Sequence, residues 1–467
     1  MGYVQEFIDK LELRSDDFDV PVRDLTSDQL ARVMRKGNED RYVLENSLIS
    51  GFFGSSIKYS ESKDLTSYEN NIMQNVLFDY MDEIGFKLVD SCAFKNDAIW
   101  KSPIQNKQYY GEEVLVVYSD AILFFEDPKN TLRKYCINIK IDEYNRNFID
   151  CAVYSSIEDV TLRDILDYAK KHNFYKGMKV DAHAKHLHLD NEVNWDDVIL
   201  PENILECAKN NVFELFKVSK ILAENNIAMK RGVIFSGPPG VGKTMLIKSI
   251  INHVDSTVIY VLPSHIKNIK DINLICEMAK DLAPTLLVIE DIDYIAEDRN
   301  DSQLTGLAIE LMNKLDGLES MDGVITLAST NMVEKIENAI KNRPGRFDRV
   351  IRFDEPNEEC RLKMLYNFTK NCKLEKDVNL EKIAQKTKGM TGAYIKDLCN
   401  YSAMLAAIEG SYKGKKKKIY IARKHFVQAL KEVSEKDFST YREELKEKNS
   451  KVGFVTEMES EDSIFNI

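Results

Sequence analysis

The sequence has no apolar run long enough to cross a membrane. Nowhere do apolar residues continue for the roughly 18 positions that a bilayer-spanning helix needs. The first residues, Met1 to Glu6, contain no basic region followed by an apolar one, and Glu6 does not fit a myristoylation signal. These absences predict a protein with neither a signal peptide nor a membrane partner, and we expect it in the cytoplasm.

The sequence also lacks paired cysteines and an excess of positive charge. Its eight cysteines are scattered without a Cys-x-x-Cys pair, which is typical of reduced core residues in the cytosol. The formal net charge of −12 argues against a protein that binds nucleic acid over its whole surface, although a local basic groove is compatible with it. The length of 467 residues allows two to four domains, and the composition is that of a soluble globular protein.

The hydrophobic pattern divides the chain into five parts. In one part strands alternate with helices, which predicts a parallel α/β sheet, and the part after it shows only helices. The expected limits are a poorly defined segment over 1–65, an α+β domain over 66–190 that binds a partner, an α/β domain over 191–355, a helical domain over 356–436 and a polar tail over 437–467.

The α+β part begins with a long amphipathic helix. Apolar residues recur at helical spacing over 67–88. Residues 113–118 and 121–125 then read as two strands joined by Ser119 and Asp120, which predicts a β-hairpin. Two more strands over 135–139 and 148–154 and a helix over 162–174 complete the domain.

Two polar clusters outside the α/β part allow more than one interpretation. His183, His186 and His188 could ligate a transition metal, but no cysteine or carboxylate cluster adjoins them, so a polar strand face is favoured. The lysine-rich run 413–418 is typical of a solvated loop, with a contact to phosphate or an acidic partner as the alternative.

The strongest motif lies between an apolar strand pattern over 232–235 and a helical pattern over 245–251. It fits G-x-x-x-x-G-K-[ST] without a mismatch, and in this setting its backbone N–H groups and the helix N-terminus hold phosphate. Lys243 can reach the β- and γ-phosphates, and the Thr244 hydroxyl can ligate magnesium. The motif predicts binding of ATP and Mg²⁺ by Gly237, Pro238, Pro239, Gly240, Val241, Gly242, Lys243 and Thr244.

Polar side chains follow two further buried strands. The apolar strand over 286–289 ends in Glu290, Asp291 and Asp293, and three acids at one strand tip repel each other unless a cation is present. Asn331 follows the strand over 324–328, where it could bond both the γ-phosphate and the attacking water.

The segment over 342–349 holds three arginines that cannot all pair locally. Of these, Arg346 and Arg349 are suited to act as arginine fingers, which are worth ~10³–10⁵ in rate. A finger supplied by a neighbouring subunit makes hydrolysis depend on assembly.

These residues together resemble the AAA family of ring-forming P-loop ATPases, from Trp195 to Val433. The resemblance implies a P-loop core with a helical lid, assembled as a homohexamer that remodels or disassembles a protein partner. It also implies roles by position. Lys243, Glu290, Asp291, Asn331, Arg346 and Arg349 would be catalytic, Thr244 and Glu290 would hold the metal, and Val198, Gly392 and Ala393 would contact nucleotide, with Ala393 standing where other P-loop ATPases carry an arginine.

Two departures from the family pattern keep alternatives open. The order Glu290-Asp291 resembles the mitochondrial Bcs1 branch; by position Glu290 would support magnesium and Asp291 would polarise water, but the roles could be exchanged. The segment 263–270 holds no aromatic residue, although many family unfoldases grip substrate there. A nucleotide-gated assembly factor that does not thread its partner is therefore one alternative, and a nucleic-acid-dependent ATPase that uses the run 413–418 is another.

Overall fold

The computed structural model describes residues 3–4, 41–54, 57–95, 98–100, 102–110, 113–141, 148–158, 160–189, 193–227, 229–294, 311, 321–331, 349–412 and 419–432. The chain forms two compact units, Met1–Leu187 and His188–Ile467. Among the residues just given, no helix combines the length and the apolar character needed to cross a membrane.

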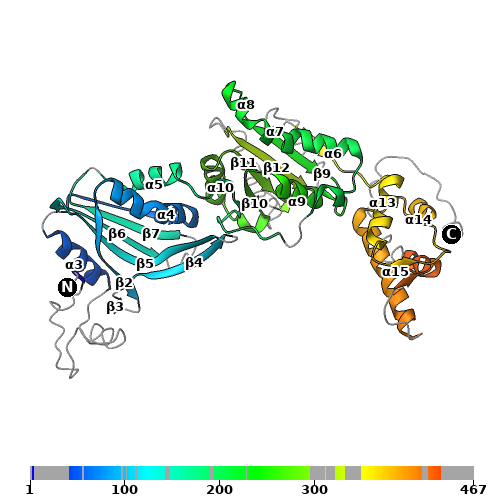
Figure 1. Cartoon of the computed structure of the whole chain (residues 1–467), viewed down its shortest axis with the longest axis horizontal. Helices are drawn as coiled ribbons and strands as arrows, with labels where there is room; N and C mark the ends of the chain where they lie inside the picture. Colours follow the sequence, from blue (N-terminus) through cyan, green and yellow to red (C-terminus); the bar gives the residue numbers. More distant parts are fainter. Residues whose placement is uncertain are drawn as a thin grey trace. The chain divides into compact units, whose positions relative to one another are not determined.

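The first unit is an antiparallel sheet with helices on both faces. Its strands run in the order β1-β7-β6-β5-β2-β3, with β4 also paired to β5 (Figure 1). One core packs α4 and α5 against the sheet, and a second core packs α3 against it. The elements are α3 (Arg41–Phe53), β1 (Tyr59–Thr66), α4 (Ser67–Glu83), β2 (Lys87–Lys95), β3 (Ala98–Trp100), β4 (Ile104–Tyr110), β5 (Glu113–Asp127), β6 (Asn130–Ile141), β7 (Phe148–Ser155), α5 (Leu162–Lys171) and β8 (Lys179–Asp181).

Local sequence signals fix both ends of α4. Thr66 accepts a hydrogen bond from the backbone N–H of Glu69, and the Glu69 carboxylate accepts one from the Thr66 N–H, which is a capping box. Gly85 then takes φ of 91°, a left-handed conformation that stops a helix. The predicted helix over 67–88 is therefore wrong in its last turn, where the chain already enters β2.

The predicted hairpin around Ser119 and Asp120 is wrong. Strand β5 continues through both residues, and only its register against β4 shifts there. The turn lies instead between β5 and β6, where the carboxylate of Asp127 accepts a hydrogen bond of 2.8 Å from the backbone N–H of Lys129. Pro128 also favours a turn at this point, whereas Ser119-Asp120 offers no glycine or asparagine for the left-handed residues of a tight hairpin.

The histidine-rich stretch is a turn rather than a strand face. It follows β8, with Ala184 at φ of 57° and an isolated bridge between Val180 and His186. Within the described ranges, no group of three or more histidine, cysteine, aspartate or glutamate residues is arranged to hold a metal ion.

The second unit contains a parallel sheet whose strands run in the order β13-β9-β12-β11-β10. Every residue of β11 and β12 is buried, which explains their continuous apolar sequences, because central parallel strands are covered on both faces. The elements are η3 (Trp195–Asp197), α6 (Glu202–Ala208), a π-helical turn (Lys209–Phe213), α7 (Glu214–Lys217), α8 (Ser219–Glu224), β9 (Arg231–Ser236), α9 (Lys243–His253), β10 (Thr257–Val261), η5 (Pro263–His265), α10 (Ile269–Asp281), β11 (Thr285–Ile289), β12 (Val324–Thr330) and β13 (Arg349–Arg352).

Helices dominate the chain after β13. They enclose a core of their own, in which Leu365, Ile395 and Phe426 are almost fully buried. The elements are α13 (Glu358–Thr369), β14 (Lys373–Leu374), α14 (Leu380–Lys386), α15 (Gly392–Tyr412), β15 (Tyr420–Ile421) and a helix over 423–432. The predicted fold class is confirmed: an α/β core with a helical lid follows an α+β region.

Candidate functional site

The phosphate loop joins β9 to α9 and has little freedom to move. Gly240 and Gly242 take φ of 79° and 103°, which glycine adopts at low cost. A Cβ on Gly240 would lie 2.7 Å from the Cβ of Ala393, and one on Gly237 would lie 2.1 Å from the carbonyl oxygen of Phe353. The loop is thus packed closely against the lid on one side and against the residue after β13 on the other.

Lys243, the first residue of α9, is buried beneath this loop. Its Nζ donates hydrogen bonds to the carbonyl oxygens of Gly237 (2.7 Å) and Pro238 (2.8 Å) and to Oδ1 of Asn331 (2.9 Å). Burial lowers the pKa of Lys243, and the acids at the end of β11 act in the opposite direction. The ammonium group is therefore oriented at the point where three strands end.

Glu290, directly after β11, is a buried carboxylate with an incomplete set of partners. Its Oε2 accepts a hydrogen bond of 2.9 Å from the Thr244 hydroxyl, while its Oε1 is buried without a partner in hydrogen-bonding geometry among the described residues. Burial raises the pKa of Glu290, and the nearby hydroxyls of Tyr260 and Thr244 partly oppose the rise. A buried carboxylate of this kind is stabilised by a cation.

Asp291, the residue after Glu290, has an unusual backbone conformation. It takes φ of 48°, and its N–H donates to the Ser329 hydroxyl at 2.9 Å. Its Oδ1 accepts a hydrogen bond of 3.3 Å from Nδ2 of Asn331. Asn331 in turn is held through its backbone N–H by Oδ1 of buried Asp293 at 3.1 Å. Left-handed backbone at a residue other than glycine is costly and is concentrated at functional sites.

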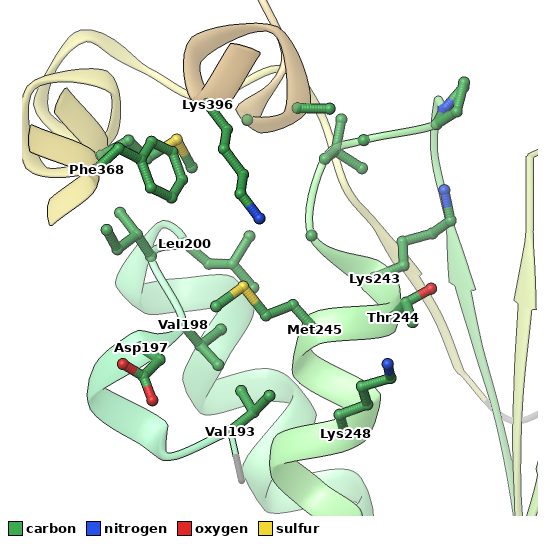
Figure 2. A pocket seen from close by; sticks show the side chains of 18 of the residues that line it. Val193, Asp197, Val198, Leu200, Lys243, Thr244, Met245, Lys248, Phe368 and Lys396 are labelled. Carbon is green, nitrogen blue, oxygen red and sulfur yellow. The ribbon is translucent and has the colours of Figure 1, made fainter. Parts of the chain in front are cut away.

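A cavity of about 670 Å³ opens beside these residues. Its volume is within the range of small-molecule sites. Figure 2 shows its walls: the Val198 region on one side, Lys243, Thr244 and Met245 on another, and Lys396 entering from the lid. The lining residues are Val193, Asp197, Val198, Ile199, Leu200, Pro239, Gly240, Val241, Gly242, Lys243, Thr244, Met245, Lys248, Asp291, Asn331, Met364, Phe368, Gly392, Ala393 and Lys396.

The structure gathers most of the predicted site residues at this cavity. Val198, Gly392 and Ala393 line it, as do the loop residues from Pro239 to Thr244 and the two side chains of Asp291 and Asn331. Gly237, Pro238 and Glu290 do not line it, and Glu290 is instead bonded to the Thr244 hydroxyl. Arg349 begins β13, is exposed and does not line the cavity. Arg346 and the lysine run 413–418 lie outside the described residues.

These residues fit a nucleotide with its magnesium ion. The glycine positions leave a cradle that side chains would fill, and the N-terminus of α9 faces it. The unpartnered Oε1 of Glu290 and the adjacent Thr244 hydroxyl are oxygen donors of the kind that Mg²⁺ prefers, with phosphate oxygens completing its shell.

Sequence reasoning missed several residues of the site. Ser329 holds the Asp291 backbone, and Met364 and Phe368 line the cavity from α13. Met364 and Phe368 are four residues apart, so they share a helix face, but an apolar pair at this spacing predicts core packing equally well. Ser329 could have been suspected only from its place two residues before Asn331.

Comparison with known proteins places family matches on the same region. Residues 233–355 match the model of the ATPase family associated with various cellular activities (AAA). Residues 377–419 match the model of the AAA+ lid domain. Both matches fall within the second unit.

Curated relatives resemble about half of the chain. The 26S proteasome regulatory subunit 8 homolog B of Arabidopsis thaliana is 32% identical over 240 residues, 48% of this chain and 55% of that protein. The ATP-dependent zinc metalloprotease FtsH 2 of Thermoanaerobacter sp. is 34% identical over 212 residues, 44% of this chain and 40% of that protein. A cell division cycle protein 48 homolog of Archaeoglobus fulgidus is 32% identical over 263 residues, 52% of this chain and 35% of that protein. The chain therefore spans about half the length of these relatives or less.

Proposed function

Because residues 233–355 form an AAA ATPase domain and residues 377–419 its lid domain, we propose that this chain hydrolyses ATP to remodel or disassemble a protein partner. The observation that carries the proposal is the convergence of Lys243, Asp291 and Asn331 on one cavity, with Glu290 and Thr244 paired at its edge. Ends of parallel strands at a crossover are the usual place for nucleotide binding.

The loop and Lys243 bind the phosphates. The amide groups at the start of α9 point at the cradle, and the Lys243 ammonium, already directed by two carbonyl oxygens, neutralises phosphate charge. Thr244 and Glu290 would hold Mg²⁺, which when bound neutralises charge developing on the phosphates. This arrangement orients the terminal phosphate towards Asn331.

Asp291 and Asn331 activate water. Asp291 lines the cavity and Glu290 does not, which supports Asp291 as the group that accepts a proton from the attacking water. Asn331 is bonded to both Lys243 and Asp291, so it can hold the water and the γ-phosphate together.

Assembly into a ring would complete the site. Arg349 is exposed and lies outside its own cavity, which suits a finger that serves a neighbouring subunit. We propose a homohexamer with Arg346 and Arg349 as fingers, and with the first unit selecting the protein partner in the cytoplasm. Turnover per subunit should then rise with protein concentration, and Arg346→Ala should remove most turnover while nucleotide binding persists.

Nucleotide-gated assembly without threading is the second candidate, and one observation favours it. In the segment 263–270, the side chain of Ile266 is only 7% exposed, and Asn268 caps α10 through the N–H groups of Lys270 and Asp271. The segment is thus partly built into the fold, and no aromatic side chain is present there to grip a peptide. Ile269, which is 49% exposed, is the residue to test: if Ile269→Ala abolishes remodelling but not hydrolysis, threading is supported.

A pair of isosteric acid variants tests the proposed chemistry. Asp291→Asn should lower kcat by roughly 10²–10⁴ while MgATP still binds, because the base is lost but the phosphate cradle remains. Glu290→Gln should raise the Mg²⁺ concentration needed for half-maximal activity. Turnover is measured by phosphate release and binding by fluorescent nucleotide. The reversed pattern would exchange the two roles, and a folded wild type without ATPase activity would refute the proposal.

A further inference from the structure

Lys396 is a charged side chain in the cavity for which the proposed chemistry gives no role. It belongs to α15, and it lies on the same helix face as Gly392 and Ala393, four and three residues earlier respectively. Figure 2 shows it extending from the lid into the cavity, with its amino group ending above Leu200 and Met245. Among the described residues, this amino group has no hydrogen bond or ion pair.

The start of α15 is fixed to the phosphate loop, so Lys396 has a defined position. The Ala393 N–H donates a hydrogen bond of 3.1 Å to the carbonyl oxygen of Gly240, and Thr391 Oγ1 would lie 2.9 Å from a Cβ on Gly240. The N-terminal end of a 21-residue helix, which carries a partial positive charge, thus faces the loop. Lys396 adds a full charge one turn further along.

The distribution of side chains in the cavity indicates what Lys396 would contact. One end is mainly apolar, built from residues of the linker and α13 that include Val198, Leu200 and Phe368, with the Asp197 carboxylate beside Val198. The other end is the phosphate loop with Lys243. Lys396 enters between them, beside Met245 in the first turn of α9. A nucleotide with its phosphates in the loop and its base against the apolar end would have its ribose and first phosphate between these two ends.

We propose that Lys396 is a nucleotide-binding residue of the lid that forms an ion pair with the phosphate nearest the ribose. This rests on the proposed ATP site and extends it to a part of the chain outside the phosphate loop. The contact joins the lid to the nucleotide through charge, so that the lid is held wherever a nucleotide phosphate is present, whether ATP or ADP. Nucleoside without phosphate would not engage it.

The test is competition of ATP, ADP, AMP and adenosine against a fluorescent ADP analogue on the full chain. Lys396→Ala should weaken all three nucleotides by about 10-fold, because each carries the phosphate next to ribose, and should leave adenosine unchanged. Lys396→Arg should restore most of the affinity. Lys382→Ala is the matched control, an exposed lysine of the lid on α14 that does not line the cavity.

A second measurement reports on the lid itself. Amides of α15 should gain protection from hydrogen exchange when ADP is added to the wild type, and should gain less in Lys396→Ala at saturating ADP. The inference is overturned if Lys396→Ala binds AMP and ADP as tightly as the wild type, or if adenosine weakens by the same factor as AMP. If the wild type itself binds no nucleotide, the proposed ATPase function is refuted together with the role of Lys396. If the wild type binds nucleotide and Lys396→Ala binds it equally well, only the role of Lys396 is refuted.

Discussion

The two units bury a glutamate in opposite ways. In the first unit, Glu45 of α3 is 2% exposed and forms an ion pair with Lys140 of β6. In the second unit, Glu290 is 5% exposed and has the Thr244 hydroxyl as its partner at one oxygen, while its other oxygen has no hydrogen-bond partner in the described part of the chain. Glu45 has its counter-charge at contact distance, whereas Glu290 senses the charges of Lys243 and Lys248 but forms no ion pair with a described residue. The first arrangement stabilises a structure, and the second is the one expected of the proposed cation site.

One network of neutral side chains in the first unit differs from the candidate site in the same way. In the first unit, Asn71 donates to Tyr175 at 2.7 Å and to Gln108 at 2.9 Å, and Tyr110 bonds both Gln108 (2.6 Å) and Tyr175 (2.8 Å). This closed network ties α4 to β4 and to the segment after α5. The polar groups of the second unit meet at strand ends beside an open cavity. A satisfied network specifies a fold, and an incomplete one marks where a ligand is expected.

The largest stability effect should come from breaking the ion pair of the first unit. Lys140→Ala leaves Glu45 buried without its cation and should lower the free energy of unfolding by about 2–4 kcal/mol. In a Trp195→Phe background, Trp100 is the one remaining tryptophan, so its fluorescence in urea follows the first unit. Lys129→Ala, an exposed lysine in the β5–β6 turn, is the control. If both variants unfold like the wild type, Glu45 is not held by Lys140.

A smaller loss of stability is expected from alanine substitutions at two glycines that have the same backbone conformation but different surroundings. Gly240 and Gly389 have φ of 79° and 85°, so alanine at either should cost about 1–2 kcal/mol. Only at Gly240 would the new Cβ meet the lid, 2.7 Å from the Cβ of Ala393; at Gly389 the space is open. Gly240→Ala should therefore also weaken ADP binding by at least about tenfold, and Gly389→Ala should not. Equal nucleotide affinity in the two variants would contradict the close fit of loop and lid.

The meeting of the candidate site residues could be predicted from sequence because parallel strands bring their carboxyl ends together. Gly237, Glu290 and Asn331 each follow a buried apolar strand, and β11, β12 and β9 lie side by side. Polar residues that follow neighbouring parallel strands meet at one edge of the sheet, and this rule can be applied to a sequence without a structure. The matches to the two family models confirm the prediction of an AAA domain with a helical lid.

Other features depend on three-dimensional contacts that no local pattern encodes. The left-handed backbone of Asp291 depends on Ser329, 38 residues away, and the approach of Lys396 depends on how the lid meets the loop. The hairpin expected at Ser119 failed because the long β5 has partners along its length, β4 on its first part and β6 on its second. The limits of the domains and the role of each site residue stay predictions.

The smallest effect should come from neutralising Glu290, and its sign is the opposite of that for Lys140. Burial raises the pKa of Glu290 above its value in the unfolded state, so the unfolded state loses this proton first as the pH rises. Above that pH, folding has to bury a charged carboxylate, which lowers the free energy of unfolding. Glu290→Gln should therefore raise the melting temperature of the second unit by roughly 2–4 °C at pH 7 without Mg²⁺ and nucleotide. The gain should vanish below the ordinary pKa of glutamate and be reversed by saturating MgADP, which binds the wild type better.

Glu359→Gln is the control with the opposite sign, since Lys363 lowers the pKa of this exposed carboxylate. A loss of stability in Glu290→Gln at pH 7 would show that Glu290, like Glu45, is already paired within the fold.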